Sequence, residues 1–245
     1  KAINIINRYS KTVVSVDIPT GVNADTGNVV RVAVKADYTV TFGLLKPGLL
    51  FYPGADFAGE ITVADISLPK EILEDENIKK NVVTNEFIRS ILPRRSKDSH
   101  KGKNGKVAVV AGSKQYPGAA FLTATGVLKS GAGLITLLAP ENIRDIMAIK
   151  LSEVMTKPVK DTLEGTFSAE SIEEILNFSR DCKVLAIGPG ISQNESVATI
   201  VTTIIQEVEC PLVIDADAIN VLEGQSSILT SAKTEPILTP HIREM

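Results

Sequence analysis

Residues 106–140 read KVAVVAGSKQYPGAAFLTATGVLKSGAGLITLLAP, and the order of apolar runs and glycines in them indicates the fold class. The run 106–112 is apolar and rich in valine, which predicts a strand that ends in a glycine turn. Small residues with a glycine-rich exit at 118–133 predict a helix, and the apolar run 134–140 predicts a second strand. Near-continuous apolar strands joined by a helix are typical of a parallel sheet that is covered on both faces.

The same alternation continues along the chain after residue 140. We expect helices at 168–179 and 194–208, and strands at 183–190, 211–218 and 236–240, with a short helix before the last strand. The predicted fold class is therefore α/β, with a doubly wound parallel sheet. Sheets of this kind bind ligands beyond the carboxyl ends of their strands.

The first part of the chain is poorer in helix. Its β-branched runs predict strands at 12–19, 37–43 and 59–66, with only a short helix at about 33–36. Three strands with so little helix cannot bury both faces of a sheet, so we expect this region to be the end of a larger α/β domain.

A charged stretch without glycine, LPKEILEDENIKKNVVT at 68–84, separates the two regions. Its first half predicts a short helix. We expect one domain over residues 1–69, a linker over 70–83 and a second domain over 84–245.

Composition excludes several classes of protein. Hydrophobic residues make up 44% and charged residues 22% of the 245, as in a globular protein, and the net charge is −3 with scattered cations, which argues against a nucleic-acid surface. No apolar run approaches the roughly 18 residues that span a bilayer, so no membrane partner is expected.

Cys182 and Cys210 show no metal-ligand spacing, and we expect two reduced thiols in a cytoplasmic protein. Lys1 stands where a complete chain would have Met, so we expect the N-terminus to be missing or processed.

Four polar or glycine-rich stretches follow predicted strands and should share one edge of the sheet. They are AGSKQYPGAA at 111–120, IGPGIS at 187–192, DADAIN at 215–220 and TPHIREM at 239–245. Glycines at such an edge let backbone N–H groups face a phosphate, and a helix N-terminus adds partial positive charge. Singly each is weak evidence, because a glycine can mark only a turn, two acids can be solvated, and His241 can be structural. Their convergence favours a binding site. The P-loop pattern is absent. The most similar stretch, HKGKNGK at 100–106, lacks the Ser or Thr that ends this pattern, and it precedes a predicted strand where a P-loop follows one.

The stretch KDSHKGKNGKVAVVAGSKQYPGAAFLTATGVLKSGAGLITLLAP at 97–140, followed by AIGPGIS, VIDADAINVL and ILTPHIREM, resembles the start of the ADP- or ATP-dependent NAD(P)H-hydrate dehydratase family. That family has a ribokinase-like fold. The stretches VVSVDIPTGVNADTGNV at 13–29 and ADYTVTFGLLKPGLLFYPGADFAGEITVADISLP at 36–69 resemble the C-terminal part of the Rossmann-like NAD(P)H-hydrate epimerase, which many bacteria fuse to the dehydratase in this order.

The resemblance implies nicotinamide nucleotide repair. An epimerase (isomerase) interconverts the R and S forms of hydrated NADH and NADPH. A dehydratase (lyase) phosphorylates the S hydroxyl with ADP, and loss of phosphate restores NAD(P)H. ADP with magnesium, potassium, the hydrated nucleotides and a homo-oligomer of the full-length form are the implied cofactors and partners.

The resemblance also implies site residues. In the dehydratase part, Ala119, Gly190 and His241 fall where the family binds the hydrated nucleotide, and three further polar residues are expected near the same cleft: Asp215, Asp217 and Asn220. In the epimerase part, Asp17 falls where the family contacts the nucleotide and is a candidate for proton transfer, and Thr20 falls at a potassium ligand. The simpler alternative is that Asp17 and Thr20 only form a capped turn, and the resemblance favours the functional interpretation.

Two interpretations remain open for the loop at the start of the second domain. Lys101, beside His100, could bind an anion, or the loop could only pack against the domain.

The family pattern continues beyond both ends of this chain. The dehydratase's donor site and catalytic Asp are expected after TPH, and the epimerase's potassium-binding Asn is expected before residue 1. The family usually has Pro-Gly-Glu-Met after TPH, whereas this chain has Ile242-Arg243-Glu244-Met245. We therefore expect the 245-residue chain to be an internal fragment without a complete active site.

Two other functions fit the fold. A ribokinase-like kinase of a small metabolite shares the cleft, but it would not carry VDIPTG at 16–21. A non-catalytic binding module would be favoured by loss of Asp17 or Thr20, and both are present.

Overall fold

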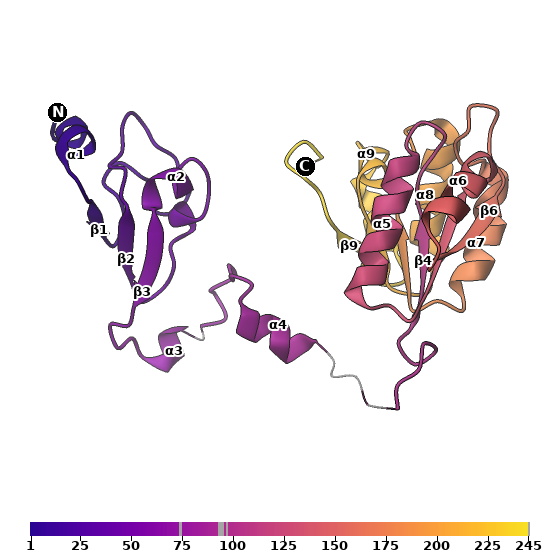
Figure 1. The fold of residues 1–245 in the computed structure, drawn as a ribbon, viewed down its shortest axis with the longest axis horizontal. Coiled ribbons are helices and arrows are strands. Elements are labelled where there is room, and N and C mark those ends of the chain that lie inside the picture. Colours follow the sequence, from indigo (N-terminus) through magenta and orange to yellow (C-terminus); the bar gives the residue numbers. More distant parts are fainter. Residues whose placement is uncertain (74, 93–95, 97, 245) are drawn as a thin grey trace. The chain divides into compact units, whose positions relative to one another are not determined.

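The computed structural model describes residues 1–73, 75–92, 96 and 98–244. The chain divides into two compact units, Lys1–Leu92 and Pro93–Met245 (Figure 1).

The first unit is built on a parallel sheet of three strands, β1 (Val14–Val16), β2 (Tyr38–Phe42) and β3 (Glu60–Ala64), in that order. Helix α1 (Ala2–Tyr9) precedes the sheet, and the turn η1 (Pro47–Leu49) and the short helix α2 (Ala55–Ala58) lie between β2 and β3. Thr39 and Thr41 of β2 are buried, and the Thr39 hydroxyl donates to the Ala58 carbonyl at 2.6 Å. The three predicted strands are confirmed, each shorter than its apolar run.

The predicted helix at 33–36 is wrong. These residues form no helix, and their backbone groups bond to distant segments instead. The amide of Val34 donates to the Thr20 carbonyl and that of Ala36 to the Phe57 carbonyl, both at 2.9 Å. The Asn7 side chain donates to the Ala33 carbonyl at 2.9 Å. Tertiary hydrogen bonds therefore override the weak helix preference of this four-residue run.

Two helices follow the first sheet. Helix α3 (Lys70–Leu73) confirms the short helix predicted in the charged stretch, and α4 (Asn85–Ile91) begins where the Thr84 hydroxyl accepts from the Phe87 amide at 3.1 Å.

The second unit is built on a six-stranded sheet in which every pair is parallel. Its spatial order is β6 (Met155–Val159), β5 (Leu134–Pro140), β4 (Lys106–Val110), β7 (Val184–Ile187), β8 (Leu212–Ile214), β9 (Ile237–Leu238). The chain winds outward from β4 through β5 to β6, and then crosses back to β7 on the other side of β4 and winds outward through β8 to β9. The order of the strands therefore reverses between β4 and β7.

Helices cover both faces of this sheet, as predicted (Figure 1). Val109 of β4 packs in a core with α5 (Pro117–Ser130) and α6 (Arg144–Lys150). Ala108 and Val110, which point to the opposite face, pack in a core with α7 (Ile172–Ser179) and α8 (Glu195–Glu207). The predicted helix at 168–179 begins as the turn η3 (Ala169–Ser171) before α7. Short helices α9 (Asp217–Asn220) and η4 (Ser226–Ser231) lie between β8 and β9.

The pattern-based prediction missed β6, α6 and the turn η2 (Glu141–Ile143) before α6. Strand β6 is an edge strand that reads MTKPV, and Pro158 and two polar residues hide its alternation. Cys182 and Cys210 are both free thiols. None of the described helices is long and apolar enough to cross a membrane.

Candidate functional site

The turns after β4 and β7 lie against each other at the point where the strand order reverses. The Gly112 amide donates to the Pro189 carbonyl at 2.8 Å, and the Ser192 hydroxyl lies 3.4 Å from the Ser113 hydroxyl. In open α/β sheets the crevice at this switch point is the general place for a ligand. The candidate site therefore begins at this pair of turns.

Ala119 and Gly190 meet in this crevice. Gly190 has φ +69, and a Cβ added to it would lie 2.7 Å from the Ala119 Cβ and 2.8 Å from the Tyr116 Cβ. Both residues are half-buried, and Ala119 lies in the first turn of α5. A small side chain at 119 and none at 190 let the two turns pack closely at the start of α5, where the Ala119 amide donates to the Tyr116 carbonyl at 3.2 Å. Tyr116, which is exposed at 45%, lies beside Gly190 just before α5 begins.

The two acids after β8 are both held by neighbouring loops. Asp217 accepts from the Ser192 amide at 2.9 Å and from the Gln193 side chain at 3.0 Å, so both of its oxygens are engaged. Asp215 accepts from the Thr239 hydroxyl at 2.8 Å, which joins the ends of β8 and β9. Asp217 thus fixes the IGPGIS turn, whereas Asp215 faces a cavity.

A cavity of about 520 Å³ lies between α5 and the sheet and reaches Asp215 and Thr239. Its walls are mostly apolar, with one polar end at the carboxyl edge of the strands. The lining residues are Val107, Thr123, Gly126, Val127, Ser130, Ala132, Val184, Ala186, Ile187, Pro189, Val213, Asp215 and Thr239.

His241 lies in the turn after β9, and its hydrogen bonds and ion pair among the described residues are all local. Its Nδ1 accepts from the Arg243 amide at 3.1 Å, and its Nε2 lies 3.3 Å from Glu244 Oε1. An Nδ1 that accepts a hydrogen bond places the proton of the neutral ring on Nε2. Within the described residues no hydrogen bond or ion pair joins His241 to Ala119 or Gly190. Its side chain is 66% exposed, so the ring remains accessible to a ligand.

Asn220 lies beside the turn that contains His241. It lines a hollow of about 400 Å³ together with Leu238, Arg243 and Glu244, and its backbone amide donates to the Ala216 carbonyl at 3.1 Å.

The loop with His100 and Lys101 lies at the opposite edge of the sheet. It precedes β4, and the Lys101 carbonyl oxygen would lie 1.9 Å from a Cβ added to Gly133, just before β5. The loop therefore packs against the amino ends of the strands, away from the switch-point crevice.

In the first unit, Asp17 follows β1 with φ +67, a left-handed conformation that is uncommon for a residue with a side chain. Its Oδ1 accepts from Lys46 Nζ at 2.5 Å, from the Phe42 amide at 3.1 Å and from the Thr41 hydroxyl at 3.2 Å. The Lys46 hydrogen bond, followed by the Phe42 amide, holds the pKa of Asp17 below its usual value.

Thr20 lies three residues after Asp17 and is exposed. Its carbonyl is taken by the Val34 amide, and no hydrogen bond of its hydroxyl is found among the described residues. That hydroxyl is a hard oxygen ligand of the kind that suits potassium. The described part of the chain holds no cluster of three or more His, Cys, Asp or Glu side chains that could bind a metal.

Sequence reasoning missed Lys46 and Thr239. Lys46 is the only cation between residues 36 and 69 and stands in the otherwise apolar run GLLKPGLL, which was an available signal. The sequence around Thr239 carries no such signal, because the hydrogen bond from its hydroxyl to Asp215 depends on the pairing of β8 with β9.

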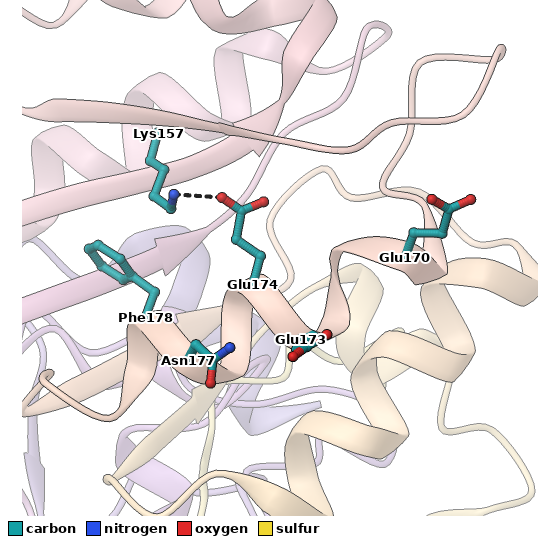
Figure 2. Close-up of a pocket in the computed structure, with 6 residues that line it drawn as sticks. All are labelled: Lys157, Glu170, Glu173, Glu174, Asn177 and Phe178. Atoms are coloured by element: carbon teal, nitrogen blue, oxygen red, sulfur yellow. Dashed lines mark ion pairs between the residues drawn. The ribbon is translucent and has the colours of Figure 1, made fainter.

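A separate surface hollow of about 490 Å³ lies between β6 and α7 (Figure 2). Its walls carry three glutamates, of which Glu174 pairs with Lys157 at 2.5 Å and Glu170 pairs with Lys160. No residue predicted for the site lines it.

Comparison with known proteins gives two family matches. Residues 107–245 match the family model described as NAD(P)H-hydrate dehydratase, and residues 1–48 match the model described as YjeF-related protein N-terminus. The proteins named bifunctional NAD(P)H-hydrate repair enzyme Nnr from Moorella thermoacetica and Thermofilum pendens are 39% and 40% identical. The matches cover 99% and 100% of this chain, but 46% of each relative, so the chain spans about half the length of the curated relatives it matches.

The fold also matches a solved structure. A ribokinase-like superfamily protein from Enterococcus faecalis has a TM-score of 0.54 and 22% identity, with 67% of this chain and 57% of that chain covered. This likeness shows the fold, and it confirms the ribokinase-like architecture expected for the second unit.

Proposed function

Because the chain belongs to the NAD(P)H-hydrate dehydratase family, we propose that it acts in the repair of hydrated NADH and NADPH. Residues 84–245 would serve the ADP-dependent dehydration of the S epimer. Residues 1–69, joined by the linker 70–83, would serve the interconversion of the R and S epimers. The observation that carries the proposal is the contact of Ala119 with Gly190 at the switch point of the sheet.

The proposed dehydration transfers a phosphoryl group from ADP to the hydroxyl of the hydrated ring, after which phosphate leaves and the ring double bond is restored. Such a reaction depends on positioning and on stabilisation of charge. Ala119 and Gly190 would let the hydrated ring approach the backbone, and the exposed His241 ring would donate or accept a hydrogen bond at its polar end. Asp215, Asp217 and Asn220 would shape the cleft rather than react, since the two acids are held by Thr239, Ser192 and Gln193.

Two metal ions belong to this proposal. Magnesium would accompany ADP and neutralise charge on the transferring phosphate. The Thr20 hydroxyl would contribute one oxygen to a potassium ion next to the epimerase site. A cytoplasmic location and a homo-oligomeric full-length form complete the proposal.

Binding of the hydrated nucleotide tests this function directly. We expect the chain to bind hydrated NADPH in isothermal titration calorimetry, and Ala119→Leu to weaken binding at least about tenfold, which is about 1.4 kcal/mol, because the larger side chain fills the crevice beside Gly190. Lys129→Leu is the matched control, since Lys129 is exposed near the other end of the same helix and should bind like the wild type.

Two results would contradict the proposal. One is wild-type protein that does not bind the hydrate, and the other is equal affinity in Ala119→Leu. Binding of a small pyrimidine or thiazole alcohol in place of the hydrate would favour the metabolite-kinase alternative. Return of NADPH absorbance after addition of ADP and magnesium would overturn the expectation that the 245-residue chain lacks a complete active site.

A further inference from the structure

Lys46 is held at the centre of three oxygen acceptors. Its Nζ lies 2.5 Å from Asp17 Oδ1, 2.7 Å from the Phe42 carbonyl and 3.0 Å from the Thr41 hydroxyl. An ammonium group has three N–H donors, so this set satisfies all of them. Only 25% of the Lys46 side chain is exposed, which is low for a lysine. The cation is therefore fixed in one orientation, next to a residue of the proposed epimerase site.

The two oxygens of Asp17 have different surroundings. Oδ1 accepts from Lys46, Thr41 and Phe42, whereas no donor to Oδ2 is found within the described chain. The Asp17 side chain is 42% exposed. One oxygen is thus anchored, and the other is open to a ligand.

We propose that Lys46 is the positioning residue of Asp17 and presents its Oδ2 to the ligand as a fixed hydrogen-bond acceptor. The inference rests on the proposed function, because it assigns Asp17 to a nucleotide-binding site. In this role Asp17 accepts a hydrogen bond from a hydroxyl of the substrate. It does not carry out the proton transfer that was expected from the sequence.

The charges around Asp17 support this role. Strand β2 contributes Thr41 and Phe42 to the contact, and neither of them titrates, while the turn before η1 contributes Lys46. Lys46 lowers the pKa of Asp17 first through its hydrogen bond and also through its charge. A carboxylate with a lowered pKa is a weaker base, so it accepts hydrogen bonds at neutral pH without taking up the proton.

The lowered pKa of Asp17 makes part of the stability of the fold depend on pH. Because the folded state lowers the pKa of Asp17, the pair stabilises the fold fully above the ordinary carboxyl pKa of 3.8. That stabilisation disappears as the pH falls from 3.8 through the lower pKa of the folded state. Removal of the Lys46 charge should abolish this acid-sensitive contribution to the free energy of unfolding.

Carbon-detected NMR titration of the Asp17 carboxyl in the 245-residue chain tests the inference, with Asp17→Asn used to assign the signal. We expect a midpoint below 3.8 in the wild type, a rise toward 3.8 in Lys46→Met, and a midpoint that stays low in Lys46→Arg. Lys35→Met is the matched control, because it removes an exposed lysine of the same unit and should leave the midpoint unchanged. If Lys46→Met does not fold, Lys46→Gln replaces it in the titration.

An Asp17 midpoint that is the same with and without the Lys46 charge overturns the inference. A second measurement decides the proposed function separately: the affinity for hydrated NADPH, taken with Ala119→Leu present in every protein so that binding at the second unit does not mask binding at the first. If the wild type binds, Lys46→Met and Asp17→Asn should each weaken binding, and the double variant should lose little more than either single variant. Additive losses would overturn the positioning role. If the wild type does not bind while the titration shift is present, the proposed function fails and the pairing of Lys46 with Asp17 stands.

Discussion

At the scale of single residues, two glycines control the turn after β7. Gly188 has φ +133, and a Cβ added there would lie 1.7 Å from the Asp215 carbonyl oxygen. Gly190 has φ +69 and faces Ala119. The first glycine lets the chain pass close to the β8 turn, and the second lets it pack against Ala119 and Tyr116. Both properties require a residue without a side chain.

Gly188→Ala should therefore destabilise the second unit by about 2–3 kcal/mol or more, because the added methyl group meets backbone and the conformation is strained. Urea denaturation followed by circular dichroism measures the effect. Gly126→Ala is the control, since the residue lies inside α5 and the added Cβ would meet no described atom within 4 Å beyond its chain neighbours and the backbone of its own helix. It should be neutral or stabilise by up to about 1 kcal/mol. Equal stabilities of the two variants would show that the turn tolerates a side chain.

The sequence predicted several site residues but not their contacts. Ala119 and Gly190 were expected at one edge, and the structure brings them together. Asp17 was expected at a strand end, but Lys46 was not, because 29 residues separate the pair and only the β1–β2 pairing joins them. His241 was expected in the turn after β9, and its bonds to Arg243 and Glu244 depend on how that turn closes.

At the scale of elements, α8 shows how a local signal and burial act together. Asn194 caps the helix by accepting from the Val197 amide at 2.9 Å, and its side-chain amide donates to the Thr166 hydroxyl at 2.9 Å. Five residues of α8 are buried, so the cap stabilises a helix that contributes much of the hydrophobic core. They are Val197, Ile200, Val201, Ile204 and Ile205.

Asn194→Ala should lower the free energy of unfolding by about 1–2 kcal/mol, because it removes the cap and the bond to Thr166. Chemical denaturation of the purified chain gives this value. Thr84→Ala removes the cap of α4, a helix with no buried residue, and should change the unfolding of the second unit by less than about 0.5 kcal/mol. A larger effect from Thr84→Ala than from Asn194→Ala would contradict this account.

At the scale of the whole molecule, each unit carries its own buried residues. Leu49 and Ala58 are buried in the first unit, and Ile204 and Leu185 are fully buried in the second. A core substitution should therefore act on the unfolding of its own unit.

Differential scanning calorimetry checks this expectation. Ile204→Ala should destabilise the second unit by about 2–5 kcal/mol, because it leaves a cavity under α8, and should shift one transition only. Leu49→Ala should shift the other. A single transition that moves equally in both variants would show that the units unfold as one.

The sequence alone determined the α/β class and the parallel winding of the second unit, because apolar runs, helix periodicity and glycine turns are local properties. It could not determine the edge strand β6, whose pattern Pro158 and polar residues hide, or the irregular segment at 33–36, whose hydrogen bonds are long-range. Only the tertiary structure decided that β5 and β7 lie on opposite sides of β4, which creates the crevice. Only it paired Lys46 with Asp17, since both arrangements depend on strand pairing between residues far apart in the chain.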